Sequence, residues 1–143
     1  MTKLTLFMML TLLSYPAFSR EHPIDTALTH CLDKDSASTT SGMMDCLIQA
    51  HDAWDKELNK QYKLLMADLN DESKASLRQS QQAWIKYRDS YFSAMRDYYS
   101  TQDGSIWKIV HGEQRLNVVK EKALSLESLY KSLCLAEAED CQH

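Results

Sequence analysis

The segment QQAWIKYRDSYF, residues 81–92, gathers the side chains of this chain that are best suited to chemistry. It places the indole of Trp84, the guanidinium of Arg88 and the carboxylate of Asp89 within six positions. On a helix, residues three, four and seven apart share one side, which here groups Trp84, Tyr87, Arg88 and Tyr91. Asp89 points elsewhere, so a direct pair between Arg88 and Asp89 is not assumed.

Two interpretations fit this cluster. Tryptophan, tyrosine and arginine anchor protein interfaces, which favours a surface that faces a partner. The same residue types also occur on the buried face of a helix, where long side chains carry their polar ends to the rim. We favour the buried face, with Arg88 bridging to an acid on a neighbouring helix, and Asp55 is the candidate acid.

No other pattern in the chain has the spacing of a catalytic or metal site. There is no Gly-x-Ser-x-Gly segment and no phosphate-binding loop, and the carboxylates lie among lysines on helix surfaces. His30, Cys31 and Cys46 resemble a metal site in type alone, and oxidation of the thiols is the better interpretation. His51 is expected to be a hydrogen-bonded core residue. We therefore expect no catalytic residue, no metal and no cofactor.

The first 19 residues have the order of a secretory signal peptide. Lys3 precedes an apolar run over residues 4–13, and small residues follow before residue 20. The apolar run is too short to span a bilayer, so no membrane span is expected. We predict export to the periplasm or beyond, with residues 20–143 forming a single domain.

Charge and cysteine usage are consistent with such a protein. The formal net charge is −4, which argues against binding to nucleic acid because the phosphate backbone would be repelled. Four cysteines in an exported chain predict two disulfides. They are Cys31, Cys46, Cys134 and Cys141.

Apolar periodicity predicts three long helices and no strands. The first is expected from Met43, with a stripe formed by Leu47, His51, Trp54, Leu58, Gln61, Leu65 and Leu69. The second, capped by Asn70 or Asp71, runs to about Tyr99, with a stripe formed by Leu77, Trp84, Tyr87, Tyr91, Met95 and Tyr98. The third begins at about Ile106, and Gly112 is expected to kink or fray its start.

Short connections between three long helices imply an up-down-up bundle, preceded by a polar N-terminal arm. In such a bundle Cys46 and Cys134 lie at opposite ends, on the order of 35–40 Å apart. A disulfide needs Cα atoms within about 7 Å, which favours the pairs Cys31–Cys46 and Cys134–Cys141.

Two segments carry a resemblance to a known family. AWDKELNKQYKLL, residues 53–65, and LRQSQQAWIKYRD, residues 77–89, are similar to the lysozyme inhibitor LprI-like N-terminal domain family of small exported helical proteins. Its motif residues fall here on Asp55, Leu58, Asn59, Tyr62, Trp84, Arg88 and Asp89. Cys31 and Cys46 match the family's early cysteine pair. The family's second disulfide is missing, since Tyr91–Phe92 and His111–Gly112 occupy those regions.

The resemblance implies a non-enzymatic binding protein whose partner is a protein, with lysozyme as the first candidate. A protruding loop would suffice to block the cleft of such an enzyme, and the candidates are residues 36–42 and 101–107. Within the second loop we select Gly104, Ser105 and Trp107, with Trp107 as an exposed anchor. The alternatives are an envelope adaptor or immunity-type partner of another secreted protein, and a binder of metal or small molecules.

Overall fold

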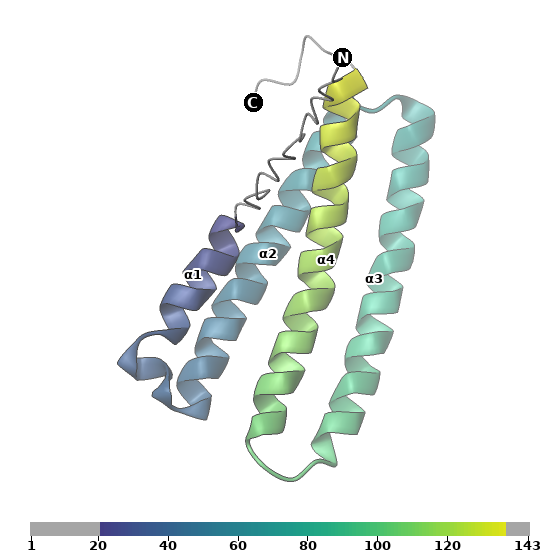
Figure 1. Cartoon of the computed structure of the whole chain (residues 1–143). Coiled ribbons are helices and arrows are strands. Elements are labelled where there is room, and N and C mark those ends of the chain that lie inside the picture. The colour runs from purple at the N-terminus through teal and green to yellow at the C-terminus, as the bar shows by residue number, and fades with distance from the viewer. Residues whose placement is uncertain (1–20, 137–143) are drawn as a thin grey trace, which may run out of the picture.

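The structure is a computed structural model that describes residues 21–136, and every regular element in that range is helical. In the described range the chain forms four α-helices and one short 3₁₀-helix, and Figure 1 shows how the α-helices are arranged. Their bounds are α1 Pro23–Leu32, η1 Asp35–Ser38, α2 Thr40–Asp68, α3 Asp71–Ser100 and α4 Ile106–Ala136. The predicted signal peptide and Cys141 lie outside the described residues.

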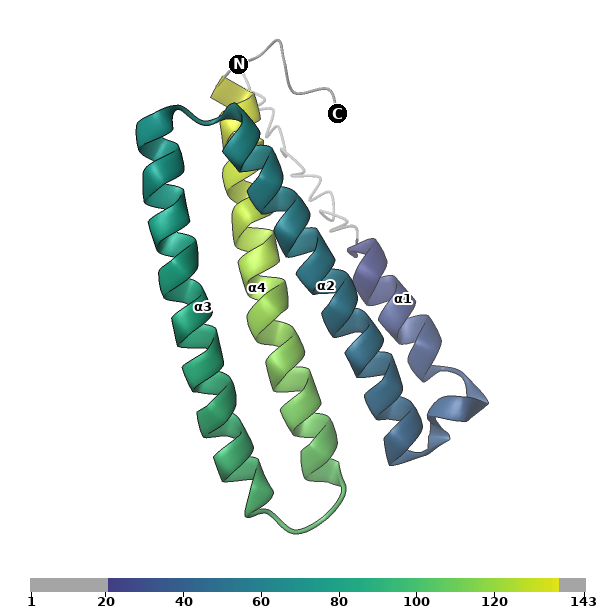
Figure 2. The same cartoon turned by 180° about the vertical axis from the view of Figure 1, so that it is seen from behind.

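The helices α2, α3 and α4 run up, down and up, as the sequence predicted (Figures 1 and 2). The predicted polar arm contains a longer helix than the one or two helical turns that DTALTHCL, residues 25–32, indicates: residues 23–32 form α1, which packs alongside α2. Pro23 at the first turn favours a helix start, and the His22 Nδ1 caps it by accepting a hydrogen bond from the Ile24 N–H at 3.2 Å. Ile24 and Leu28, one turn apart, pack against the core.

The core lies mainly between α2 and α4. Trp54 and Leu65 of α2 and Val119 and Ala123 of α4 are fully buried. Gly112 lets the two helices approach closely, because a Cβ there would lie 3.1 Å from the Leu47 Cδ1. The predicted kink or fraying at Gly112 is therefore wrong, since α4 runs through this residue and uses it for packing.

The helix α3 is held less closely than the other two. Figures 1 and 2 show its backbone standing apart from α2 and α4 along most of its length. Long side chains make the connection: the Arg115 guanidinium lies 4.7 Å from the Phe92 ring centroid, and the Lys122 ammonium lies 5.9 Å from the Trp84 centroid. Burial lowers the pKa of Lys122 below its usual 10.5.

The disulfide Cys31–Cys46 is confirmed, with a Cα–Cα distance of 5.7 Å. It ties α1 to the start of α2 across a folded connection rather than a loose loop. The predicted Cys134–Cys141 pair involves a residue outside the described range, so it stays a prediction.

The connection before α2, which contains residues 36–42, is a folded turn whose residues are mostly exposed. Ala37 is buried, and α2 begins at Thr40 rather than Met43, capped by the Thr39 hydroxyl. A Cβ on Gly42 would collide with the backbone carbonyl of Ser36, so this turn lies directly on the first turn of α2. The segment is therefore an ordered turn held against α2, and its role as an inhibitory loop stays a prediction.

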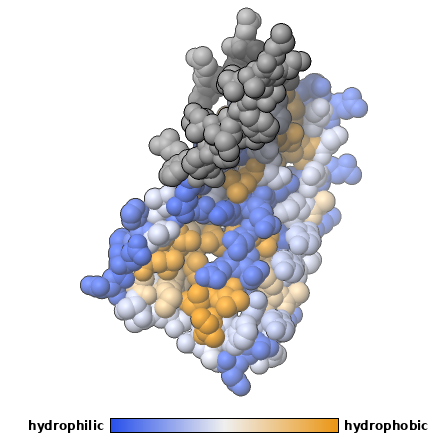
Figure 3. Space-filling view, viewed as in Figure 1, coloured by the Kyte–Doolittle hydropathy of each residue, from blue (hydrophilic) through white to orange (hydrophobic). Residues whose placement is uncertain are grey.

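Apolar side chains gather over α1 and the first half of α2 on the face shown in Figure 3. A groove of about 360 Å³ lies there, beside the disulfide, lined by Ile24, Leu28, Ala50 and Ala53. Its described lining has no charged side chain. In residues 21–136, no helix has an apolar stretch that meets the length and hydropathy needed for a bilayer crossing.

Candidate functional site

The charged residues of the two sequence motifs form separate local pairs. On α2, the Asn59 amide donates to the Asp55 carboxylate at 3.0 Å. On α3, Arg88 donates to Asp89 through Nε and Nη2, at 2.9 and 2.8 Å. The predicted Arg88–Asp55 bridge is therefore wrong. The helix α3 stands away from α2, and Arg88 pairs with its sequence neighbour Asp89 instead.

The aromatic residues of the second motif are only partly covered. Trp84 is half-buried and packs against the core, with the Arg88 guanidinium 5.2 Å from its ring centroid. Tyr87 is 58% exposed and stacks on the exposed Tyr91 ring at 5.7 Å. The prediction of a buried face holds for Trp84 and fails for the two tyrosines. Leu58 and Tyr62, from the first motif, belong to the core and its edge.

A polar cluster that sequence reasoning missed joins α1, α2 and α4. The Asp25 carboxylate accepts hydrogen bonds from the Trp54 Nε1 at 3.3 Å and from the Lys120 Nζ at 2.7 Å. The Lys120 ammonium also lies 5.6 Å from the Trp54 ring centroid, and His22 stacks on that indole at 4.3 Å. Asp25 and Lys120 are 95 positions apart, so no local pattern could pair them.

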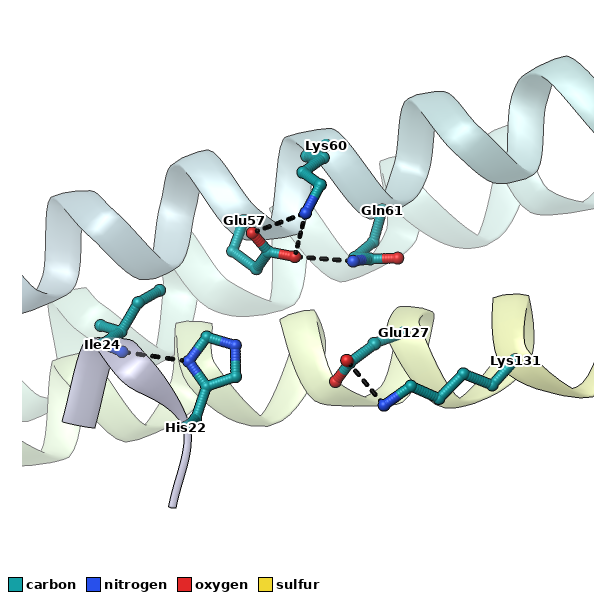
Figure 4. A network of polar contacts seen from close by, with 7 residues as sticks. All are labelled: His22, Ile24, Glu57, Lys60, Gln61, Glu127 and Lys131. Atoms are coloured by element: carbon teal, nitrogen blue, oxygen red, sulfur yellow. Dashed lines mark hydrogen bonds and ion pairs between the residues drawn. The ribbon is translucent and has the colours of Figure 1, made fainter. Parts of the chain in front are cut away.

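A second polar group lies further along α2 (Figure 4). The Glu57 carboxylate accepts from the Gln61 amide at 2.6 Å and from the Lys60 ammonium at 3.2 Å. Burial raises the pKa of Glu57, but the hydrogen bonds from Gln61 and Lys60 outweigh it, and the pKa lies below its usual 4.5. Figure 4 also shows a separate Glu127–Lys131 pair on α4 at 2.7 Å. The Glu57–Lys60 and Glu127–Lys131 ion pairs each lie within a single helix, and such pairs contribute little to stability.

The turn between α3 and α4 contains the three predicted contact residues. Gly104 has a φ of +103°, a backbone conformation that favours glycine, and Gly104 and Ser105 are exposed. Trp107 is half-buried in the first turn of α4, and its ring centroid lies 6.0 Å from that of Tyr99. The indole is therefore half-buried and rests against the Tyr99 ring, so it is less exposed than the predicted anchor.

Behind this turn lies a groove of about 260 Å³ between the end of α3 and the start of α4, here named the α3–α4 groove. Its lining includes Arg96, Tyr99, Gln102, Trp107, Lys108 and His111. Among the described lining residues there are aromatic, amide, hydroxyl and cationic groups but no carboxylate.

Two histidines have a buried ring nitrogen without a hydrogen-bond partner in the described part of the chain. His111 stacks on Tyr99 at 5.3 Å, and its Nε2 is unpaired. Burial lowers the pKa of His111 below its usual 6.5, and the nearby Arg115 and Arg96 charges lower it further. The prediction of a hydrogen-bonded core residue at His51 is wrong, since its Nε2 is also unpaired.

Within residues 21–136, no group of three or more histidine, cysteine, aspartate or glutamate side chains is placed to hold a metal ion. The sulfurs of Cys31 and Cys46 are bonded to each other, so neither is a free thiolate for the metal site considered with His30.

The fold and its surfaces define a helical protein with one disulfide in the described range and several shallow grooves, among them the groove beside the disulfide and the α3–α4 groove. The chain belongs to the family described as lysozyme inhibitor LprI, whose profile matches residues 31–126. No curated protein matches the sequence.

Among solved structures, the chain is similar to the crystal structure of an uncharacterized protein from Burkholderia thailandensis. The TM-score is 0.75 at 27% sequence identity, over 78% of this chain and 54% of that chain. The present chain thus spans about half the length of that protein.

Proposed function

We propose that this protein is an exported, non-enzymatic binding protein that inhibits a lysozyme-type muramidase. Membership of the lysozyme inhibitor LprI family over residues 31–126 is the observation that carries this proposal. The disulfide supports an extracytoplasmic location, since such bonds persist in oxidising compartments such as the periplasm.

The turn over residues 101–105, with Trp107 behind it, is the contact surface that we assign. Its tip is exposed at one end of the bundle, where it can enter a cleft without a clash from the other helices. Trp107 is supported by Tyr99, and a rigid aromatic side chain loses little conformational entropy on binding. The mildly acidic chain also gives weak electrostatic steering toward a basic enzyme.

The first test is lysis of peptidoglycan by several lysozyme types, with and without the purified, oxidised protein. We expect dose-dependent inhibition. Replacement of Trp107 with Ala should raise the inhibitor concentration needed at least tenfold, because truncation of an interface anchor costs about 2 kcal/mol or more. Circular dichroism of the variant should retain the helical signal.

The matched control is Tyr87→Ala, which removes an exposed aromatic ring from the middle of α3. Equal loss of inhibition in both variants would place the contact surface elsewhere. Absence of inhibition by the wild-type protein would contradict the proposal and favour another envelope protein as the binding partner. Affinity capture from envelope extract would then test for an adaptor or immunity-type role.

A further inference from the structure

The α3–α4 groove shares Gln102, Gly104 and Trp107 with the proposed inhibitory contact, but its lining also includes Arg96, Tyr99, Lys108 and His111, which that contact does not use. That contact needs only a protruding turn, whereas the groove is a hollow of about 260 Å³ behind the turn. A concave surface is not complementary to the concave active-site cleft of an enzyme, so we consider a separate ligand for the groove.

Aromatic rings form one part of the groove. The Tyr99 ring lies between two others, with centroids 6.0 Å from Trp107 and 5.3 Å from His111, and the planes are inclined by 31° and 28°. These rings, in contact with one another, form an aromatic wall of the groove, here named the Tyr99–Trp107 platform. The groove also contains the Gln102 amide and the Ser100 hydroxyl, which can pair with hydroxyl groups of a ligand.

Cationic groups form another part. Arg96 and Lys108 both line the groove, and no carboxylate does so among its described residues. The nearest acid to Arg96 is Asp97, at 3.8 Å from its Nε, which is a weak pair between two exposed side chains. The Arg96 Nη2 donates to the Ser93 hydroxyl at 2.9 Å, a contact that orients the guanidinium without neutralising it.

We propose that the α3–α4 groove binds one sugar ring that carries a carboxylate. The ring would lie against the Tyr99–Trp107 platform, and the carboxylate would pair with Arg96 and Lys108 in charge-assisted hydrogen bonds. The groove is smaller than the 300–1,000 Å³ typical of drug-sized ligands, which matches a monosaccharide unit rather than a long peptide. This inference stands whether or not the protein inhibits lysozyme.

The test uses the full disulfide-bonded protein and two sugars that differ in one group. N-acetylmuramic acid carries a lactyl carboxylate, and N-acetylglucosamine has the same ring without it. We expect NMR titration with the acidic sugar to shift the Trp107 indole and Tyr99 ring signals. The neutral sugar should bind at least tenfold more weakly.

The imidazole of His111 supplies a second readout. It lies beside the platform, and the positive charge of Arg96 acts on it. A bound carboxylate would offset that charge, so the His111 pKa should rise on addition of the acidic sugar and stay unchanged with the neutral one.

The variant Arg96→Gln/Lys108→Gln should abolish the preference for the acidic sugar and leave any weak binding of the neutral sugar. Arg78→Gln is the matched control, since it removes an exposed arginine near the other end of α3. It should leave both affinities unchanged.

Four results would overturn the proposal. These are no binding of either sugar, equal binding of both, binding of the acidic sugar that survives the double replacement, and binding of a glutamate-rich peptide as tight as that of the acidic sugar. The last result would assign the groove to acidic peptides. Loss of lysozyme inhibition alone would leave the sugar site untouched.

Discussion

The Asp25 carboxylate holds three helices together, because it accepts hydrogen bonds from Trp54 on α2 and Lys120 on α4. Replacement of Asp25 with Ala would leave the buried Trp54 N–H without a partner and the Lys120 ammonium without its counter-ion. We expect the free energy of unfolding to fall by about 1–3 kcal/mol, measured by urea denaturation.

The control for this variant is Asp103→Ala, which removes an exposed carboxylate from the α3–α4 turn. Its effect should stay within about 0.5 kcal/mol of the wild type. Equal stability of the two variants would mean that the Asp25 cluster contributes nothing beyond packing.

His111 should make folding sensitive to pH. Its pKa lies below the usual 6.5 in the folded protein, so the unfolded chain binds the proton more readily. The resulting stability is fully present above about pH 6.5 and is lost as pH falls through the folded pKa. Thermal unfolding between pH 7.5 and 5 should show a steeper loss in the wild type than in His111→Gln.

The matched variant here is His30→Gln, which changes an exposed histidine in α1. It should keep the pH slope of the wild type. If His111→Gln and the wild type had parallel slopes, protonation of His111 would not be coupled to folding.

At this scale the sequence predicted the apolar residues better than the polar pairs. The positions of Trp54 and Leu58 follow from helical spacing, and both are buried as expected. Pairs between charged residues depend on distances between helices, which spacing does not contain. Arg88 therefore meets Asp89 instead of Asp55, and the Asp25–Lys120 bridge came without any signal in the sequence.

At the scale of the elements, the turn before α2 packs closely against the first turn of α2 at Gly42. Gly42 faces the backbone carbonyl of Ser36, and the Cys31–Cys46 bond restrains how far the turn can move. Gly42→Ala should lower the free energy of unfolding by about 1–3 kcal/mol despite the better helix propensity of alanine, because the added methyl group collides with backbone. Chemical denaturation of the oxidised protein measures this change.

Ser41→Ala is the natural comparison, since Ser41 is exposed in the same turn. Its stability should remain within about 0.5 kcal/mol of that of the wild type. Stabilisation by Gly42→Ala would show that the 3₁₀ turn can shift freely and that helix propensity dominates.

Element prediction from the sequence succeeded where apolar periodicity was long and failed where it was short. The three long helices have several turns of repeated apolar positions, and Asn70 caps α3 as predicted, accepting from the Ser73 N–H at 2.9 Å. The ten residues of α1 have an apolar repeat of only about two turns, at Ile24, Ala27, Leu28 and Cys31. Tertiary packing on α2 and the disulfide supply the stability that its own pattern does not reveal.

On the scale of the whole molecule, the three long helices are packed unequally: α2 and α4 lie close together, and α3 contacts them less. The α2 and α4 helices share the core, and Gly112 allows their close approach. The sequence predicted the up-down-up order but not this inequality, because stripes on three helices do not tell which pair packs closest. The aromatic stripe of α3 has the pattern of a core face, yet Tyr87 is 58% exposed and Tyr91 is 38% exposed.

This inequality predicts that α3 opens before the rest of the molecule. Only Leu77, Gln81 and Met95 are buried on its 30 residues. Segments with few buried apolar contacts open at lower free energy than the core, so α3 amides around Tyr87 should exchange with solvent ahead of α2 amides around Trp54. Native-state hydrogen exchange followed by NMR or mass spectrometry measures both.

Replacement of Trp84 with Ala gives a second test of whether α3 opens before the other helices. Trp84 is one of two half-buried aromatic side chains of α3 that pack against the core, the other being Phe92, so Trp84→Ala should accelerate exchange along α3 further. The α2 amides around Trp54 should keep the rate of the wild type, because their core partners on α4 are unchanged. Uniform acceleration of all helices would instead show that α3 belongs to one cooperative unit with α2 and α4, and that its long side chains bind it as firmly as direct helix packing does.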